Sequence, residues 1–183
     1  ELKQLQKKLG ITFIFVTHDQ EEALTMSDRV AVLNAGRVEQ IGTVNEIYYK
    51  PATRFVASFI GESNIVEAEI LRAEGELLFC RLEGGLELAV RTPNPSARSK
   101  VLLSLRPEKI RLTRENPGGR NSFPGTIEME IFKGAVDDLT ISVLGGLQLG
   151  AVLANDGQAE SDLHEGERVF ARIQPEDIHI VAA

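Results

Sequence analysis

The spacing of apolar positions changes abruptly near the start of the chain. Leu2, Leu5 and Leu9 recur at helical intervals, and Gly10 follows where a left-handed helix cap is expected. The next run, "ITFIFVT" (11–17), is rich in β-branched and aromatic residues. Such a run is typical of a strand buried on both faces of a parallel sheet. A helix leading into this strand indicates an α/β unit.

The polar stretch after the predicted strand has the pattern of a helix N-terminus. Asp19 is a suitable N-cap, and Glu22, three residues later, is a capping-box partner. His18 therefore lies in the turn between the carboxyl end of the strand and the helix. Ligands of open α/β sheets bind at these strand ends, so His18 is a candidate site residue. Position alone also fits a purely structural hydrogen-bonding histidine.

The pattern up to Gly61 completes a small α/β unit. Residues 28–42 form two strand-like segments around a turn at 34–36, which predicts a hairpin. Thr43 and Glu46 predict a second capping box, and another amphipathic helix ends before Gly61. We therefore place a first domain at residues 1–61.

Residues 62–183 show strand-length alternation, broken by turns such as "EGG", "NPGG" and "LGG". "KVLLSLRPEKIRL" (100–112) and "RVFARIQPEDIHI" (168–180) superpose at a separation of 68 residues. "NIVEAEI" (64–70) and "PGTIEMEI" (124–131) are a fainter echo. This repetition predicts an antiparallel barrel built from two related β units, with each Pro-Glu at a bend between strands.

Two segments carry a resemblance to a known family. The stretches "FVTHDQEEALTMSDRVAVLNAGRVEQIGTVNEIYYKP" and "FVASFIGESN" resemble the C-terminal end of ABC importer ATP-binding subunits, most of all the spermidine/putrescine type. Residues 64–183 resemble the TOBE regulatory domain (transport-associated OB fold) of such ATPases. The implied fold is an α/β fragment, the end of a P-loop NTPase ABC domain (1–61), followed by an all-β OB-like TOBE barrel of two related units (62–183).

The resemblance also implies a function for the whole protein. His18 matches the switch histidine, which senses the γ-phosphate of ATP and helps to orient the attacking water. The expected activity is an ABC-type ATPase that uses ATP and Mg to drive polyamine uptake. The expected partners are a second copy (a homodimer), transmembrane permease subunits and, indirectly, a periplasmic or lipoprotein solute receptor. The expected location is peripheral, on the cytoplasmic face of the inner (plasma) membrane.

The chain lacks the sequence that binds nucleotide phosphates. No GxxxxGK[ST] loop occurs, and the family's signature, catalytic glutamate and acidic metal ligand are also not found. In the family these elements lie upstream of the helix that contains Glu1. We therefore expect a truncated chain that is inactive alone, binds no cofactor and holds no metal.

Composition and charge narrow the function further. No apolar run in the sequence approaches the about 20 residues of a membrane span, and no signal-peptide pattern occurs in it. The net charge of −7 arises entirely in residues 62–183, and the chain has no Trp, which argues against nucleic-acid binding. Cys80 is the only cysteine, so an internal disulfide is excluded, and its apolar neighbours predict a core thiol.

Other polar residues suggest weaker candidates. Arg106 could bind an anion, although its repeat partner is Gln174 and a structural role is favoured. Asp137 and Asp138 are predicted to be a solvated pair. His164 and His179 have no companions at metal-ligand spacing, so surface or edge roles are expected.

Three alternatives remain open at this point. The chain could be a stand-alone OB-like sensing module that binds a small anion at Arg106, or an OB-fold nucleic-acid binder, which the charge disfavours. The whole protein could also be the ATPase subunit of an iron, phosphonate or sugar importer, because solute recognition resides in other subunits.

Overall fold

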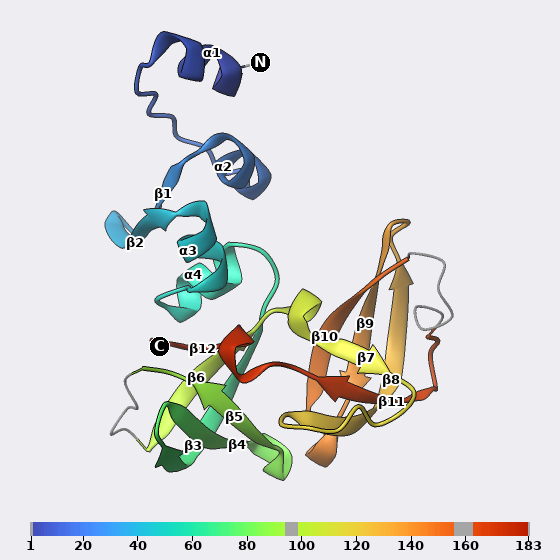
Figure 1. Ribbon diagram of the computed structural model, residues 1–183. Helices are drawn as coiled ribbons and strands as arrows, with labels where there is room; N and C mark the ends of the chain where they lie inside the picture. The colour runs from blue at the N-terminus through green and yellow to red at the C-terminus, as the bar shows by residue number, and fades with distance from the viewer. Residues whose placement is uncertain (1, 94–98, 156–162, 183) are drawn as a thin grey trace.

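A computed structural model describes residues 2–93, 99–155 and 163–182 (Figure 1). The N-terminal part contains four helices and a two-stranded sheet among the described residues. In chain order these are α1 (Leu2–Leu9), α2 (Gln20–Met26), β1 (Arg29–Asn34), β2 (Arg37–Thr43), α3 (Val44–Tyr49) and α4 (Arg54–Phe59).

The strand predicted at residues 11–17 is not formed. These residues have no regular secondary structure, and Ile14 and Val16 are 92% and 99% exposed. A strand needs a neighbour for its backbone hydrogen bonds, and no other described strand runs beside this segment. The apolar pattern is therefore present without the sheet that it was expected to join.

The predicted hairpin is present. Strands β1 and β2 pair antiparallel, with a bulge between Val32 and Leu33, and the turn places Ala35 and Gly36 at φ 48° and 76°. Two successive positive φ values match the twist of a tight hairpin. Val32 packs with apolar residues of α3 and α4, so the hairpin and the two helices share one small core.

The rest of the described chain is almost entirely β, in two curled five-stranded sheets (Figure 1). One sheet has the order β12-β6-β3-β4-β5 and the other β10-β9-β8-β11-β7. Their bounds are β3 (Asn64–Glu74), β4 (Leu77–Leu82), β5 (Glu87–Arg91), β6 (Lys100–Leu105), β7 (Arg111–Thr113), β8 (Ser122–Phe132), β9 (Val136–Ser142), β10 (Gln148–Ala154), β11 (Arg168–Arg172) and β12 (Ile178–Val181). Both sheets contribute to one core, which includes Cys80 as predicted.

The two repeats exchange their last strands. In each repeat a strand is followed by a short 3-10 helix at the Pro-Glu pair, η2 (Pro107–Lys109) or η5 (Pro175–Asp177), and then by a final strand. The final strand of the first repeat, β7, pairs with β11 of the second, whereas β12 pairs with β6 of the first. The predicted bends are confirmed, and the two units complete each other's sheets.

Two asparagines fasten the units in an equivalent way. The side chain of Asn64 accepts from Gly150 N–H at 2.6 Å and donates to the Gly150 carbonyl at 2.8 Å. Asn121 makes the same pair of bonds to Ala89, at 2.7 and 2.8 Å. Each carboxamide thus replaces a strand neighbour where a ladder stops, which satisfies backbone groups that burial would otherwise leave unpaired.

The two repeats also meet at paired glycines. The 3-10 turns η1 (Glu83–Gly85) and η3 (Leu144–Gly146) touch, and a Cβ added to Gly145 would lie 2.1 Å from Gly84 Cα. Both glycines have positive φ, at 82° and 74°. Only glycine meets both demands here, because the backbones approach too closely for any side chain.

Among the described residues, no helix has the length and apolar character needed to cross a membrane.

Candidate functional site

His18 lies in the bend that immediately precedes α2. Asp19 is the N-cap of that helix, and its Oδ1 accepts from the N–H groups of Glu21 at 2.8 Å and Glu22 at 3.1 Å. The imidazole of His18 is exposed and makes no hydrogen bond or ion pair with any described residue. A neutral imidazole with both nitrogens available can meet a phosphate oxygen or a water molecule. The backbone therefore fixes the position of His18, and no described residue occupies its ring nitrogens.

The predicted capping box at α2 is only half formed. Asp19 caps the helix, but the Glu22 carboxylate accepts from the Thr17 hydroxyl at 2.6 Å. The same hydroxyl oxygen accepts from Asp19 N–H at 3.0 Å. These two bonds therefore connect Thr17, which precedes His18, to Asp19 and Glu22, which follow it. The capping box at Thr43 and Glu46, by contrast, is complete.

Arg106 is a structural arginine, not an exposed anion site. Its side chain is 2% exposed and lies beneath the N-terminal part of the chain. The guanidinium donates to the carbonyls of Tyr48 at 2.7 and 3.2 Å, Glu62 at 2.7 Å and Ala57 at 3.4 Å. Burial lowers its pKa, and neighbouring groups oppose that shift. Its donors face backbone oxygens, so Arg106 does not supply the anion site of the stand-alone sensing model.

Tyr48 completes this buried contact. Its ring lies 4.3 Å beneath the guanidinium carbon of Arg106, and its hydroxyl donates to Glu108 at 2.9 Å. Burial, followed by the bond to Glu108, raises the pKa of Tyr48 to about 12. The tyrosine therefore stays neutral and keeps donating across the physiological range.

Further bonds connect the helix that follows His18 to the barrel. Gly61 N–H donates to Oε1 of Gln20, the first residue of α2, at 2.9 Å. A Cβ on Gly61 would lie 2.9 Å from the Tyr48 ring and 3.4 Å from Arg106 Nη1. Ala182, at the end of the barrel, exchanges backbone bonds with residues 52–54 at 2.7 and 2.9 Å. The helix after His18 is therefore linked through Gly61 to the Arg106 contact.

The prediction of a solvated aspartate pair is wrong for Asp137. Its side chain is buried, with 6% exposure, and accepts from Asn155 Nδ2 at 3.0 Å. Asp138 is half-buried and forms an ion pair with Lys133. Alternation along β9 places Asp137 on the core side, where the amide compensates the carboxylate.

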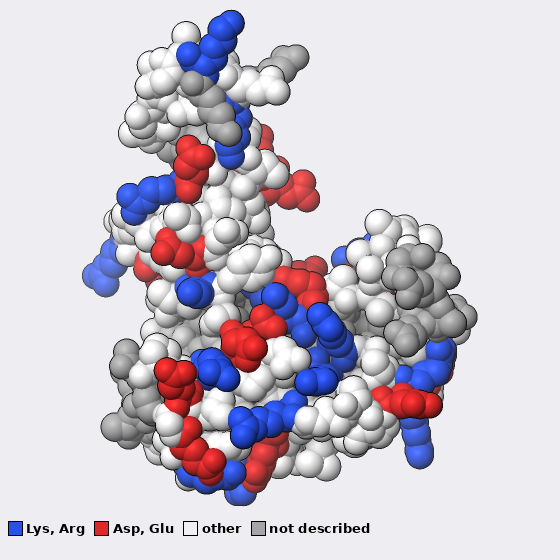
Figure 2. Space-filling view, viewed as in Figure 1, with Lys and Arg blue, Asp and Glu red and all other residues white. Residues whose placement is uncertain are grey.

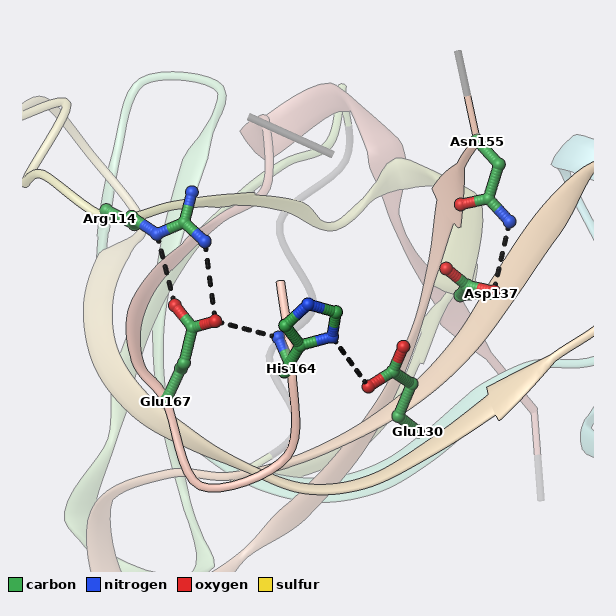
Figure 3. A network of polar contacts seen from close by, with 6 residues as sticks. All are labelled: Arg114, Glu130, Asp137, Asn155, His164 and Glu167. Atoms are coloured by element: carbon green, nitrogen blue, oxygen red, sulfur yellow. Dashed lines mark hydrogen bonds and ion pairs between the residues drawn. The ribbon is translucent and has the colours of Figure 1, made fainter. Parts of the chain in front are cut away.

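His164 belongs to a surface network (Figure 3). The ring atom Nδ1 of His164 contacts the Glu130 carboxylate at 3.2 Å. The backbone N–H of His164 donates to the Glu167 carboxylate at 3.0 Å. Arg114 donates to the same Glu167 carboxylate at 3.1 and 3.3 Å. This network holds the loop before β11 against β8, so the surface role expected for His164 is confirmed.

His179 lies on β12, which is an edge strand as expected. It is half-buried opposite Ser104, and burial lowers the pKa of its imidazole. Among the described residues there is no cluster of His, Cys, Asp or Glu able to hold a metal ion.

Known proteins resemble this chain in sequence. Residues 103–181 match the family model described as the TOBE domain. The chain is 53% identical over 136 residues to a spermidine/putrescine import ATP-binding protein of Pseudomonas aeruginosa, covering 73% of this chain and 36% of that one. Proteins with the same description from Acidothermus cellulolyticus and Thermobifida fusca are 42% and 38% identical, covering 96% and 99% of this chain and 46% and 47% of theirs. The chain thus spans less than half the length of these relatives.

A solved structure supports the barrel fold. The cytoplasmic molybdate-binding protein ModG matches with a TM-score of 0.58 and 19% identity, covering 73% of this chain and 99% of that one. This likeness shows the fold alone, in agreement with the paired β units. The sequence matches, independently of this likeness, show that the chain corresponds to the C-terminal part, including the TOBE domain, of import ATP-binding proteins such as these relatives.

Proposed function

We propose that the protein containing this chain couples ATP hydrolysis to the uptake of a solute, with polyamines as the favoured solute. The single observation that carries this proposal is the exposed, uncommitted His18 in a turn fixed by Asp19, Thr17 and Glu22. In phosphoryl transfer the protein mainly positions groups and stabilises charge. His18 acts there by contacting the γ-phosphate and orienting the attacking water.

The phosphate-binding loop and Mg ligands are assigned to sequence that this chain does not contain. When bound, Mg neutralises charge on the transferring phosphate. Within the described residues, the chain's own contribution is the histidine and the turn that holds it. We accordingly propose that residues 1–183 alone neither bind Mg nor hydrolyse ATP.

The barrel serves as a regulatory domain that follows the switch turn. The hydrogen bond from Gly61 to Gln20, and the packing of Gly61 beside Arg106, link α2 to the barrel. A displacement of α2 during the ATPase cycle would therefore reach the TOBE domain through buried contacts. Contacts of this kind carry coupling only between discrete arrangements of the packed elements.

The assembly partners are inferred from the import role of the relatives. We propose transmembrane permease subunits as direct partners and a periplasmic or lipoprotein receptor as an indirect one, with the protein on the cytoplasmic face of the membrane. Iron, phosphonate and sugar importers remain alternative contexts. Uptake of labelled spermidine and putrescine, restored by the full-length protein in a transport-deficient strain, would separate these contexts.

Replacement of His18 tests the catalytic assignment. In the full-length protein, His18→Ala should retain ATP binding but lose at least about 10²-fold in turnover, the lower range for one acid–base or positioning group. Glu21→Gln, which changes an exposed side chain in the first turn of the helix that follows His18, is the matched control and should hydrolyse ATP normally. Near wild-type turnover by His18→Ala would refute the role.

We also propose that the chain forms a two-fold homodimer through the second barrel unit. Met129, Ile131 and Phe132 at the end of β8 are 50%, 49% and 73% exposed. Adjacent exposed apolar side chains of this kind mark association surfaces, and two-fold pairing is the commonest closed symmetry.

Sedimentation of the chain tests this surface. The wild type should sediment as a dimer at micromolar concentration, and Phe132→Glu should shift it towards the monomer. Leu33→Glu, which changes an equally apolar, 60% exposed residue on β1, is the control for association through the N-terminal part. A dimer that only Leu33→Glu disrupts would contradict the proposed surface.

A further inference from the structure

Four arginines of the second barrel unit have no acidic partner. Arg111, Arg120, Arg168 and Arg172 make no ion pair or side-chain hydrogen bond with any described residue. The remaining described arginines of the barrel all have partners, which are glutamates for Arg72, Arg81, Arg91 and Arg114 and carbonyls for Arg106. In a protein of net charge −7, this local excess of positive charge requires an explanation.

Arg111 and Arg172 lie directly opposite each other. They are cross-strand partners in the β7–β11 register. Val169 and Ala171 face the core, so Arg172 is on the outer face of the sheet. Cβ atoms of opposite residues are about 5 Å apart, and like charges placed this way are destabilising. Figure 2 shows Lys and Arg side chains gathered over the junction of the two sheets, with acidic groups interspersed.

Arg172 also carries an unsatisfied buried donor. Its Nε atom is buried without any hydrogen-bond partner, although the residue as a whole is only half-buried. Arg106 shows how this fold treats a buried guanidinium, with four bonds to carbonyl oxygens. An unpaired donor of a charged group is costly, and such a group in a native structure points to a missing partner.

A glycine turn leaves space beside this guanidinium. Asn116 Oδ1 accepts from Gly118 N–H at 2.9 Å and from the Ser122 hydroxyl at 3.0 Å, which fixes the loop before β8. Gly119 has φ +84°, and a Cβ there would lie 3.4 Å from Arg172 Nη2. A side chain at this position would crowd the guanidinium. The loop therefore approaches Arg172 without placing a side chain against its Nη2 atom.

The fold itself does not require this arginine pair. In the other repeat, the residues 68 positions away are Ser104 and His179, which are also cross-strand partners. There the Ser104 hydroxyl bonds to Ser63 at 2.7 Å, Ser104 is buried and His179 is half-buried. The same place in the barrel is thus filled by a hydrogen-bonded serine and a histidine in one unit and by two unpartnered cations in the other.

We propose that Arg111 and Arg172 form a binding site for a phosphate group. Guanidinium forks carried by two directly opposite residues can both donate to the oxygens of one phosphate, and these charge-assisted bonds compensate both cations. This site lies on strands β7 and β11, apart in the sequence from the His18 turn. The phosphate belongs to a soluble phosphate compound or to a lipid headgroup, and these two sources share the same recognition chemistry.

Calorimetric titration of the chain with inorganic phosphate, against chloride at matched ionic strength, tests the site. Saturable binding is expected, and Arg111→Gln or Arg172→Gln should each weaken it at least about tenfold, as the loss of a charge-assisted bond implies. Arg168→Gln is the matched control, because it removes the same charge from the same strand face, and should change affinity less than about twofold. Arg172→Lys keeps the charge but loses the fork, and should also bind weakly.

Melting curves without phosphate establish that each variant is folded. Phosphatidylglycerol vesicles, with phosphatidylcholine vesicles as control, identify the source. Co-sedimentation with the anionic vesicles that Arg172→Gln abolishes supports a lipid headgroup, whereas binding of free phosphate alone supports a soluble compound. The proposal is overturned if neither probe binds, or if a folded Arg172→Gln protein binds both as the wild type does.

Discussion

At the scale of single residues, Arg106 carries much of the contact between the N-terminal part and the barrel. Its buried guanidinium donates to carbonyls of Tyr48, Ala57 and Glu62. Removal of the cation leaves these oxygens buried without donors, which costs more than the cation's own packing. The residue therefore stabilises by completing a polar set and not by burying apolar area.

We expect Arg106→Met to destabilise the chain by about 3 kcal/mol, because breaking a buried charged set falls in the range of 3–5 kcal/mol and some water will re-enter. Urea unfolding monitored by circular dichroism measures the change. Arg168→Gln, which removes an exposed charge, should stay within about 0.5 kcal/mol. Equal stability of the Arg106→Met and wild-type chains would show that the carbonyls are satisfied in another way.

At the scale of elements, the contact between turns η1 and η3 has no room for a side chain. Gly145→Ala would place its Cβ 2.1 Å from Gly84 Cα, so one of the turns must move. Gly146 has a similar φ of 78° but nothing within 4 Å of its added Cβ. The two positions separate backbone strain from collision between the repeats.

Gly146→Ala should therefore cost about 1–2 kcal/mol, the penalty of a left-handed residue with a side chain. Gly145→Ala should cost clearly more, by about 2 kcal/mol or above, because overpacking is added to the same strain. Thermal and urea unfolding of both variants gives the comparison. If both substitutions had the same cost, the close approach of the two turns would not limit stability.

At the scale of the whole molecule, the sequence predicts a domain boundary at residue 61, but hydrogen bonds cross this boundary. Residues 64–183 contain both sheets and the main core. However, expression without residues 1–63 removes the Tyr48, Ala57 and Glu62 carbonyls from Arg106. The barrel should thus fold alone, but with one interface residue left unsatisfied.

We expect residues 64–183 to give a β-type circular dichroism spectrum and a cooperative melt at a lower temperature than the full chain. Arg106→Met should cost much less in this shorter chain than in residues 1–183, because its carbonyl partners are already gone. The difference between the two costs measures the coupling across the boundary. An unfolded 64–183 chain would place the boundary elsewhere.

Much of the fold could be predicted because its causes are local. The repeated Pro-Glu bends and the Thr43 capping box depend on neighbours within a few residues, and both are present. The strand at 11–17 needed a distant neighbour, and the burial of Asp137 depends on Asn155. Side-chain partners far along the chain leave no periodic trace in the sequence.

The candidate site also combines features that can be predicted from the sequence with features that cannot. The N-cap at Asp19 could be predicted from its type and position, and so could the turn that contains His18. The carbonyls that surround Arg106 could not, because they come from segments 44–58 residues away in the chain. The Arg111–Arg172 pair emerges only once the strand exchange places β7 beside β11.

The exchange of final strands has a consequence for the order of folding. The edge of β6 stays open until β12, near the end of the chain, arrives to pair with it. During synthesis the first repeat is therefore obliged to wait, with an unpaired strand edge, until nearly all of the second has emerged. Closing such long loops delays folding more than it weakens the product. The pairing of β12 therefore completes two parts of the fold together, since Ala182, directly after β12, also bonds to residues 52–54.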